Sequence, residues 1–128
     1  MPRAAPNGFP CLWLRVDLAP GVSLGPGKVE LLRGIDETGS ISAAGRRIGM
    51  SYKRAWQLVD ALNRHFISPL VSASRGGARG GGASLTPLGH AILAAYQALQ
   101  TEVHDAAAQK LKRLSTQLRP AGEEGAPT

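Results

Sequence analysis

Residues 39–63 read Gly-Ser-Ile-Ser-Ala-Ala-Gly-Arg-Arg-Ile-Gly-Met-Ser-Tyr-Lys-Arg-Ala-Trp-Gln-Leu-Val-Asp-Ala-Leu-Asn, and this stretch decides the fold. Ser42 and Ser51 are each suited to cap a helix, and Gly49 is suited to the left-handed residue that ends the first helix. The small residues 44–45 let a second helix approach closely. The pattern predicts two short helices that meet at a glycine turn, which is the sequence form of a helix-turn-helix.

The second of these helices has two unlike faces. Apolar residues recur at helical spacing and are expected to face inward: Ala55, Leu58, Val59, Leu62 and Phe66. Polar, basic and aromatic residues remain on or near the outer face of its N-terminal half: Tyr52, Lys53, Arg54, Trp56 and Gln57. This composition is what a recognition helix needs.

Length and charge limit the class of protein. With 128 residues, 43% of them hydrophobic, the chain has room for one domain with a modest core. The net charge is +6, and many of the basic residues lie between positions 46 and 79. A polyanionic partner follows, because phosphate contacts supply most non-specific nucleic-acid affinity, although basic proteins also bind anionic membranes. No run of 18 apolar residues is present to span a bilayer.

The N-terminal residues contain no convincing signal peptide, so a cytoplasmic protein is the default expectation. The lone cysteine, Cys11, excludes an intrachain disulfide and a cysteine-rich zinc site. The histidines are scattered without a paired acid, and the glycine-rich stretch at 21–28 departs from the spacing of a phosphate-binding loop. We therefore expect no catalytic residues, no metal and no cofactor.

The segments before the motif predict an arm, a strand and a supporting helix. Residues 1–10 hold three prolines and are expected to be a flexible arm. Residues 12–18 alternate between apolar and polar, which is the period of a half-buried strand. A turn rich in glycine and proline is expected at 19–28, and an apolar stripe from 29 to 38 predicts a helix behind the motif.

The segment after the motif predicts a wing. Residues 68–75 and 83–85 are expected to form two short strands, with a loop between them that is rich in glycine. A hairpin directly after the second helix is the wing of a winged helix-turn-helix. Arg75 and Arg79 in this wing could reach phosphates or the minor groove. The predicted DNA-binding domain spans residues 11–86.

A long helix is predicted at residues 87–119, with Thr86 as its cap and Pro87 at its first position. At 1.5 Å per residue it would be about 48 Å long, more than a domain of this size can cover with its own core. The excess apolar stripe predicts a homodimer through Ile92, Leu99, Val103, Leu111 and Leu114. The tail at 120–128 is expected to be disordered. The fold class is mainly α with a small β-sheet.

Each candidate for DNA contact has a structural alternative. Lys53 and Arg54 are the strongest candidates, for phosphate or base contact. Trp56 could equally be a half-buried core aromatic, and Ser51 is most simply a helix cap. A function in DNA contact is favoured over a surface role for Tyr52. Two further candidates lie on the first helix, which in this motif crosses the DNA backbone, but either could be a solvated arginine: Arg46 and Arg47.

The chain also resembles a known family, the N-terminal domain of ModE molybdate-dependent transcription regulators, itself related to the winged helices of LysR-type regulators. The most specific matches are at residues 39–42, 51–56, 76–83 and 85–89. The resemblance implies a bacterial homodimer on a partly palindromic operator, with Tyr52, Lys53 and Trp56 on the helix that faces DNA. Full-length members carry C-terminal oxyanion-binding domains, so no molybdate site is carried over to this chain.

The expected function is that of a sequence-specific transcription regulator, a repressor rather than an activator, with a possible link to molybdenum metabolism and no enzymatic activity. Its partner is double-stranded DNA. Two alternatives stay open: a winged-helix adaptor for protein interactions, and an architectural DNA-binding protein without a preferred sequence. A strong salt dependence of duplex-DNA affinity would distinguish the regulator from the adaptor, and a preferred DNA sequence would distinguish it from the architectural protein.

Overall fold

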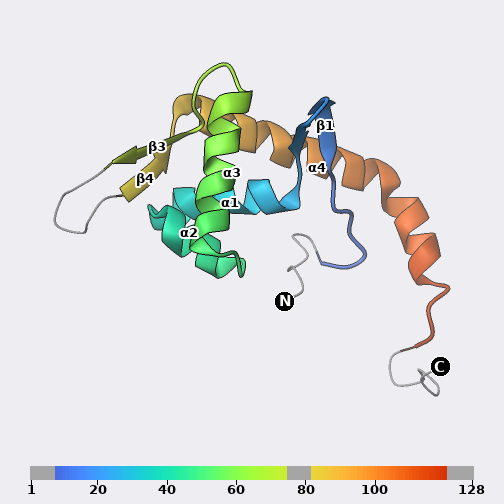
Figure 1. Cartoon of the computed structure of the whole chain (residues 1–128). Coiled ribbons are helices and arrows are strands. Elements are labelled where there is room, and N and C mark those ends of the chain that lie inside the picture. The colour runs from blue at the N-terminus through green and yellow to red at the C-terminus, as the bar shows by residue number, and fades with distance from the viewer. Residues whose placement is uncertain (1–7, 75–81, 121–128) are drawn as a thin grey trace.

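The computed structural model describes residues 8–74 and 82–120, and these ranges contain four helices and two small antiparallel sheets (Figure 1). The elements follow in the order β1 (Val16–Ala19), β2 (Val22–Leu24), α1 (Pro26–Thr38), α2 (Ile41–Arg47), α3 (Tyr52–His65), β3 (Val71–Ser74), β4 (Gly82–Leu85) and α4 (Pro87–Ser115). This is a mainly α, winged helix-turn-helix fold, as the sequence predicted.

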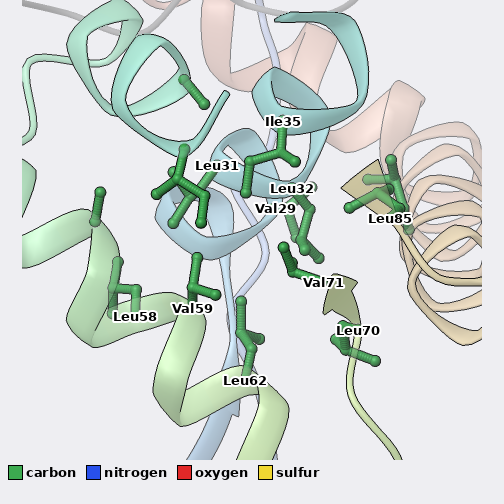
Figure 2. Packing of buried hydrophobic residues seen from close by; sticks show 14 of the residues in the cluster. Val29, Leu31, Leu32, Ile35, Leu58, Val59, Leu62, Leu70, Val71 and Leu85 are labelled. Atoms are coloured by element: carbon green, nitrogen blue, oxygen red, sulfur yellow. The ribbon is translucent and has the colours of Figure 1, made fainter. Parts of the chain in front are cut away.

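The core lies where α1 meets α3 and the base of the β3–β4 hairpin. Figure 2 shows Leu58, Val59 and Leu62 of α3 directed toward side chains of α1. Leu31, Leu32 and Ile35 of α1 are completely buried. Because these residues recur at helical spacing, each helix directs one apolar stripe inward. The other face of α3 is left in contact with solvent.

The turn of the helix-turn-helix has the predicted glycine and a different first cap. Gly49 has a φ of 70°, the left-handed conformation that glycine adopts without steric cost. The cap of α2 is Ser40, whose hydroxyl accepts a hydrogen bond from the Ala43 backbone N–H at 3.0 Å. The prediction that Ser42 caps this helix is wrong by two residues, since Ser42 already lies inside α2. Its hydroxyl accepts a hydrogen bond from the Arg46 side chain.

The helices of the motif approach closely because small residues stand at their crossing. A Cβ atom added to Gly45 of α2 would lie 3.1 Å from the Cβ of Ala55 in α3, closer than most side-chain contacts. Ala44 is completely buried on the same helix. Gly45 therefore allows the predicted close approach of α2 to α3, whereas Ala44 packs against α1, where a Cβ atom added to Gly34 would lie 2.8 Å from the Ala44 Cβ.

The N-terminal strand is shorter than the alternation predicted. Pairing begins only at Val16, and β1 pairs with β2 inside the segment that was expected to be a turn. The first supporting helix likewise starts at Pro26, three residues earlier than the apolar stripe. Proline suits this position because the first helical residues need no N–H partner. The alternation predicted the partial burial of Leu12, Leu14 and Val16 correctly, but Leu18 is 53% exposed and the backbone pairing differs from the prediction.

The segment before β1 is extended along α4. The Tyr96 hydroxyl donates to the Leu14 carbonyl at 2.5 Å, and the Gln100 amide donates to the Leu12 carbonyl at 3.2 Å. His104 Nε2 lies 3.3 Å from the Pro10 carbonyl oxygen. These side chains are four residues apart on the helix, whereas the carbonyls are two residues apart on the extended segment. The two spacings match in length, about 6 Å per step, so three successive contacts tie this segment to α4.

Helix α4 follows the hairpin and extends past the rest of the described domain (Figure 1). It ends at Ser115, four residues before the predicted end, and its 29 residues correspond to about 43 Å. Its first half joins the core through Leu93 and Tyr96, which the sequence analysis did not select. Most of the predicted arm at 1–10 and of the predicted tail at 120–128 lies outside the described residues, which leave out 1–7 and 121–128.

Candidate nucleic-acid interface

The N-terminal half of α3 presents an exposed surface of aromatic and basic side chains. Tyr52 is 63% exposed and Trp56 is 39% exposed. Their rings are in edge-to-face contact, with centroids 6.2 Å apart. Residues four apart on a helix share one face, so the pair forms a continuous aromatic surface. Trp56 is partly covered, as expected of a half-buried aromatic, and it also shares the outer face of α3 with Tyr52, so its contact with DNA stays a prediction.

Cationic side chains flank this aromatic pair. Lys53 and Arg54 are exposed, and neither has an ion-pair partner within the described residues. Ser51 accepts a hydrogen bond from the Arg54 N–H at 3.1 Å, which makes it the cap of α3. An acceptor at this position satisfies one of the free N–H groups that begin a helix. The cap thus orients the helix that presents both cations.

The two arginines of α2 differ in their contacts. Within the described part of the chain, Arg46 donates to the nearby Ser42 hydroxyl at 2.9 Å and has no carboxylate partner. Arg47 forms an ion pair with Glu37 at 2.6 Å. Exposed pairs of this kind contribute about 0–1 kcal/mol, so they exchange readily for other partners. Arg46 is therefore the more available of the two for phosphate contact.

A shallow surface pocket of about 150 Å³ lies between the aromatic pair, the start of α2 and the ends of β3 and β4 that are farthest from the core. Its lining combines aromatic rings, small residues and serine hydroxyls: Ser40, Ile41, Ser42, Tyr52, Trp56, Ala73, Ser74, Gly82 and Ala83. The hairpin strands pair in register from Val71–Leu85 to Ser74–Gly82, which aligns the wing beside α3. Arg75 and Arg79, the predicted wing contacts, lie outside the described residues.

A third group of cations was not anticipated from the sequence. Burial lowers the pKa of Lys28, and the positive charges of Arg15 and Arg54 lower it further. The three residues come from the segment before β1, the first turn of α1 and the first turn of α3. Arg15 and Lys28 carry no signal in the sequence that marks them as site residues, because they are far from the motif along the chain and no periodicity relates them to it.

The residues predicted to mediate dimerisation are spread along one helix and differ in burial. Ile92 packs against the chain's own core. Leu99 and Leu114 are 40% and 68% exposed. Val103 and Leu111 are half-buried. The C-terminal part of α4 therefore keeps apolar side chains that the described part of this chain does not cover.

Within residues 8–74 and 82–120, no three His, Cys, Asp or Glu side chains are grouped so that they could hold a metal ion. The helices of that part of the chain include none that is long and apolar enough to cross a membrane. The described surface that concentrates exposed aromatic and cationic groups is the one around α3.

The helix-turn-helix, the adjoining hairpin and the exposed basic helix define a winged helix-turn-helix protein. A family model described as "Bacterial regulatory helix-turn-helix protein, lysR family" matches residues 27–90. The chain belongs to this family. The match begins in α1 and ends in the first turn of α4, so it covers the motif and the hairpin together.

The chain is also similar to named relatives. It is 49% identical over 83 residues to the molybdenum-pterin-binding protein MopB of Rhodobacter capsulatus, covering 65% of this chain and 31% of MopB. It is 38% identical over 105 residues to the molybdenum transport protein ModE of Azotobacter vinelandii, covering 82% of this chain and 37% of that protein. The Escherichia coli DNA-binding transcriptional dual regulator ModE is 38% identical over 74 residues, with 58% and 28% covered. The chain thus spans about a third of these relatives' length.

Among solved structures, the DNA-binding domain of CbnR in complex with DNA matches with a TM-score of 0.52 at 20% identity. The match covers 70% of this chain and 95% of that domain. A likeness at this identity concerns the fold alone. It confirms the winged helix architecture that the element order and hairpin register define.

Proposed function

We propose that this protein is a transcription regulator that binds operator DNA through α3, with Tyr52 and Trp56 against base edges and Lys53 and Arg54 against phosphates. The observation that carries the proposal is the exposed, cationic and aromatic N-terminal half of α3 beside a wing. A helix of this kind fits the major groove of B-DNA, where base edges carry a distinct pattern of donors, acceptors and methyl groups.

We further propose that the protein acts as a homodimer. The exposed apolar residues Leu99 and Leu114 support this, because an uncovered stripe on a helix of 29 residues is stabilised by a second copy. A two-fold symmetric dimer would place its two α3 helices on two half-sites of a partly palindromic operator. Such a dimer would repress by occupying a promoter.

A link to molybdenum is part of the proposal and rests on the relatives. MopB is named for molybdenum-pterin binding and the Azotobacter vinelandii ModE for molybdenum transport, and they are 49% and 38% identical to this chain over the matched residues. We propose that the genes under control serve molybdenum uptake or use, and that the protein works in the cytoplasm without catalysis.

The test begins with selection of duplex DNA from a random pool by the purified protein, followed by sequencing. A two-fold symmetric consensus is expected. Affinity for that consensus is then compared between the wild type, the double variant Lys53→Ala with Arg54→Ala, and a control, Lys110→Ala with Arg119→Ala, that removes the same charges from exposed positions far along the chain.

Loss of two phosphate contacts in each protomer should reduce the slope of log K against log salt by about 1.8 per protomer, since each contact contributes about 0.9. The control variant should keep the wild-type slope to within about 0.2. Equal slopes in the two double variants would show that α3 is not the DNA-facing helix. An adaptor for proteins would show no duplex affinity at any salt, and an architectural protein would yield no consensus.

A further inference from the structure

We propose that Arg15, Lys28 and Arg54 form a second phosphate-binding surface, which holds the DNA backbone on the side of α3 opposite the wing. This inference rests on the proposed function and extends its interface to β1 and the start of α1. In Figure 1 the β3–β4 hairpin lies to one side of α3, whereas β1 lies to the other. The surface would therefore contact a stretch of backbone that the wing does not reach.

Lys28 is held in place by the fold. Its Nζ donates to the Ser23 carbonyl at 2.8 Å, so the ammonium group lies against the backbone of β2. The side chain is half-buried. A fixed cation loses little side-chain entropy on contact with an anion, which makes it a better ligand than a freely rotating surface lysine.

Arg15 lies beside the start of the helix that contains Lys28, since a Cβ atom added to Gly25, the N-cap of α1, would lie 3.6 Å from the Arg15 Cβ. Burial, and then the positive charges of Arg15 and Arg54, lower the pKa of Lys28. Lys28 and Arg54 have no carboxylate partner within the described residues. A phosphate placed among the three would remove this repulsion, because an opposite charge favours the protonated amine. The cluster is thus complementary to an anion that the described part of the chain does not supply.

Arg15 can join the site without a large cost. Its Nε is 3.1 Å from the Asp17 carboxylate, and the two side chains are 71% and 69% exposed. Exposed pairs of this kind contribute about 0–1 kcal/mol. A phosphate can therefore replace Asp17 as the partner of Arg15.

Arg54 makes the cluster continuous with the α3 surface. It stands in the first turn of α3, the turn that the proposed function brings to the major groove. Duplex DNA held by α3 presents phosphates along both edges of the groove, one toward the wing and one toward the cluster. The occupant to which the proposal commits is the phosphate of a DNA backbone. A free oxyanion has the same chemistry, and the experiment separates the two.

The experiment compares Lys28→Gln with Lys110→Gln. Both changes remove one positive charge, but Lys110 is exposed on the distal half of α4. Binding of the full chain to its selected operator is measured between 0.05 and about 0.4 M salt. Lys28→Gln should reduce the salt slope by about 0.9 per protomer, which corresponds to about eightfold weaker binding per protomer at 0.1 M salt. Lys110→Gln should leave both unchanged, and thermal unfolding confirms that each variant is folded.

A second variant, Arg15→Gln, changes an exposed side chain and should produce a reduction in the same direction even if Lys28→Gln unfolds. Equal slopes for the Lys28, Arg15 and Lys110 variants, with wild-type DNA binding intact, would overturn the phosphate surface and leave the proposed function standing. If inorganic phosphate at constant ionic strength bound the wild type but not Lys28→Gln, while DNA affinity was equal in both, the site would serve a free oxyanion instead. A wild type that bound no duplex would refute both proposals.

Discussion

Substitution of Gly89 by alanine tests the junction that joins the wing to α4. Gly89 is in the first turn of α4, and a Cβ atom there would lie 2.1 Å from the Leu70 carbonyl oxygen. That oxygen cannot simply move away, because it also accepts a hydrogen bond from the Thr86 N–H at 2.9 Å. The Thr86 side chain binds the same junction, donating to the Pro69 carbonyl and accepting from the Gly89 N–H. The added methyl group must therefore displace backbone.

The expected cost follows from three contributions. Overpacking of a dense site costs about 1–3 kcal/mol. Loss of the Thr86–Leu70 hydrogen bond adds about 1 kcal/mol. The higher helix propensity of alanine relative to glycine offsets about 1 kcal/mol of this destabilisation. The net destabilisation is about 1–3 kcal/mol, which lowers the melting temperature by at least about 4 °C in a domain of this size.

The assay is thermal and urea unfolding followed by circular dichroism, with Thr101→Ala as a control. Thr101 is exposed on the same helix, so its replacement should change stability by only a few tenths of a kcal/mol, through helix propensity. Operator affinity should also fall for Gly89→Ala, because the hairpin is positioned by this junction. A Gly89→Ala protein as stable as the wild type would refute the close approach of α4 to Leu70.

Three further outcomes are expected. Tyr96→Phe should lower the free energy of unfolding by about 0.5–1.5 kcal/mol in urea titrations, because the Leu14 carbonyl loses its donor; an unchanged midpoint would contradict that contact. Leu99→Asp should convert the proposed dimer to a monomer in sedimentation velocity, while a mass equal to the wild type would place dimerisation elsewhere. The pKa of Lys28 is lowered on folding, so between its pKa in the folded chain and 10.5 the folded chain binds fewer protons than the unfolded chain. The contribution of Lys28 to the free energy of unfolding should therefore rise with pH in this window. Lys28→Gln should lack this rise, and a matching rise in the variant would refute the assignment.

Much of the fold could be predicted because its signals are local. Gly49 ends the first helix, Ser51 caps the second, and the apolar stripe of α3 faces the core as its spacing indicated. Each of these features depends on residues within about one turn of helix, so the local sequence pattern is enough to predict it. The exposure of Tyr52 and Trp56 follows in the same way, since they occupy the face opposite that stripe.

The errors have a common origin in competition between neighbouring residues. Ser40 and Ser42 are both good caps, and the choice depends on where Gly39 ends the preceding helix, with a φ of 73°. Leu12 and Leu14 alternate like a strand, but their carbonyls accept from side chains of α4 instead of from another strand. A backbone with partners other than a sheet satisfies its hydrogen bonds equally well.

The sequence by itself determined the helix-turn-helix, because caps, turn glycines and helical periodicity act over a few residues. Only the tertiary structure decided which side chains from distant segments meet. It brings Arg15 and Lys28 to Arg54, and the segment before β1 to α4, through contacts that span up to 94 positions. Such contacts depend on how packed helices are oriented in space, and the local spacing of residues does not encode that orientation.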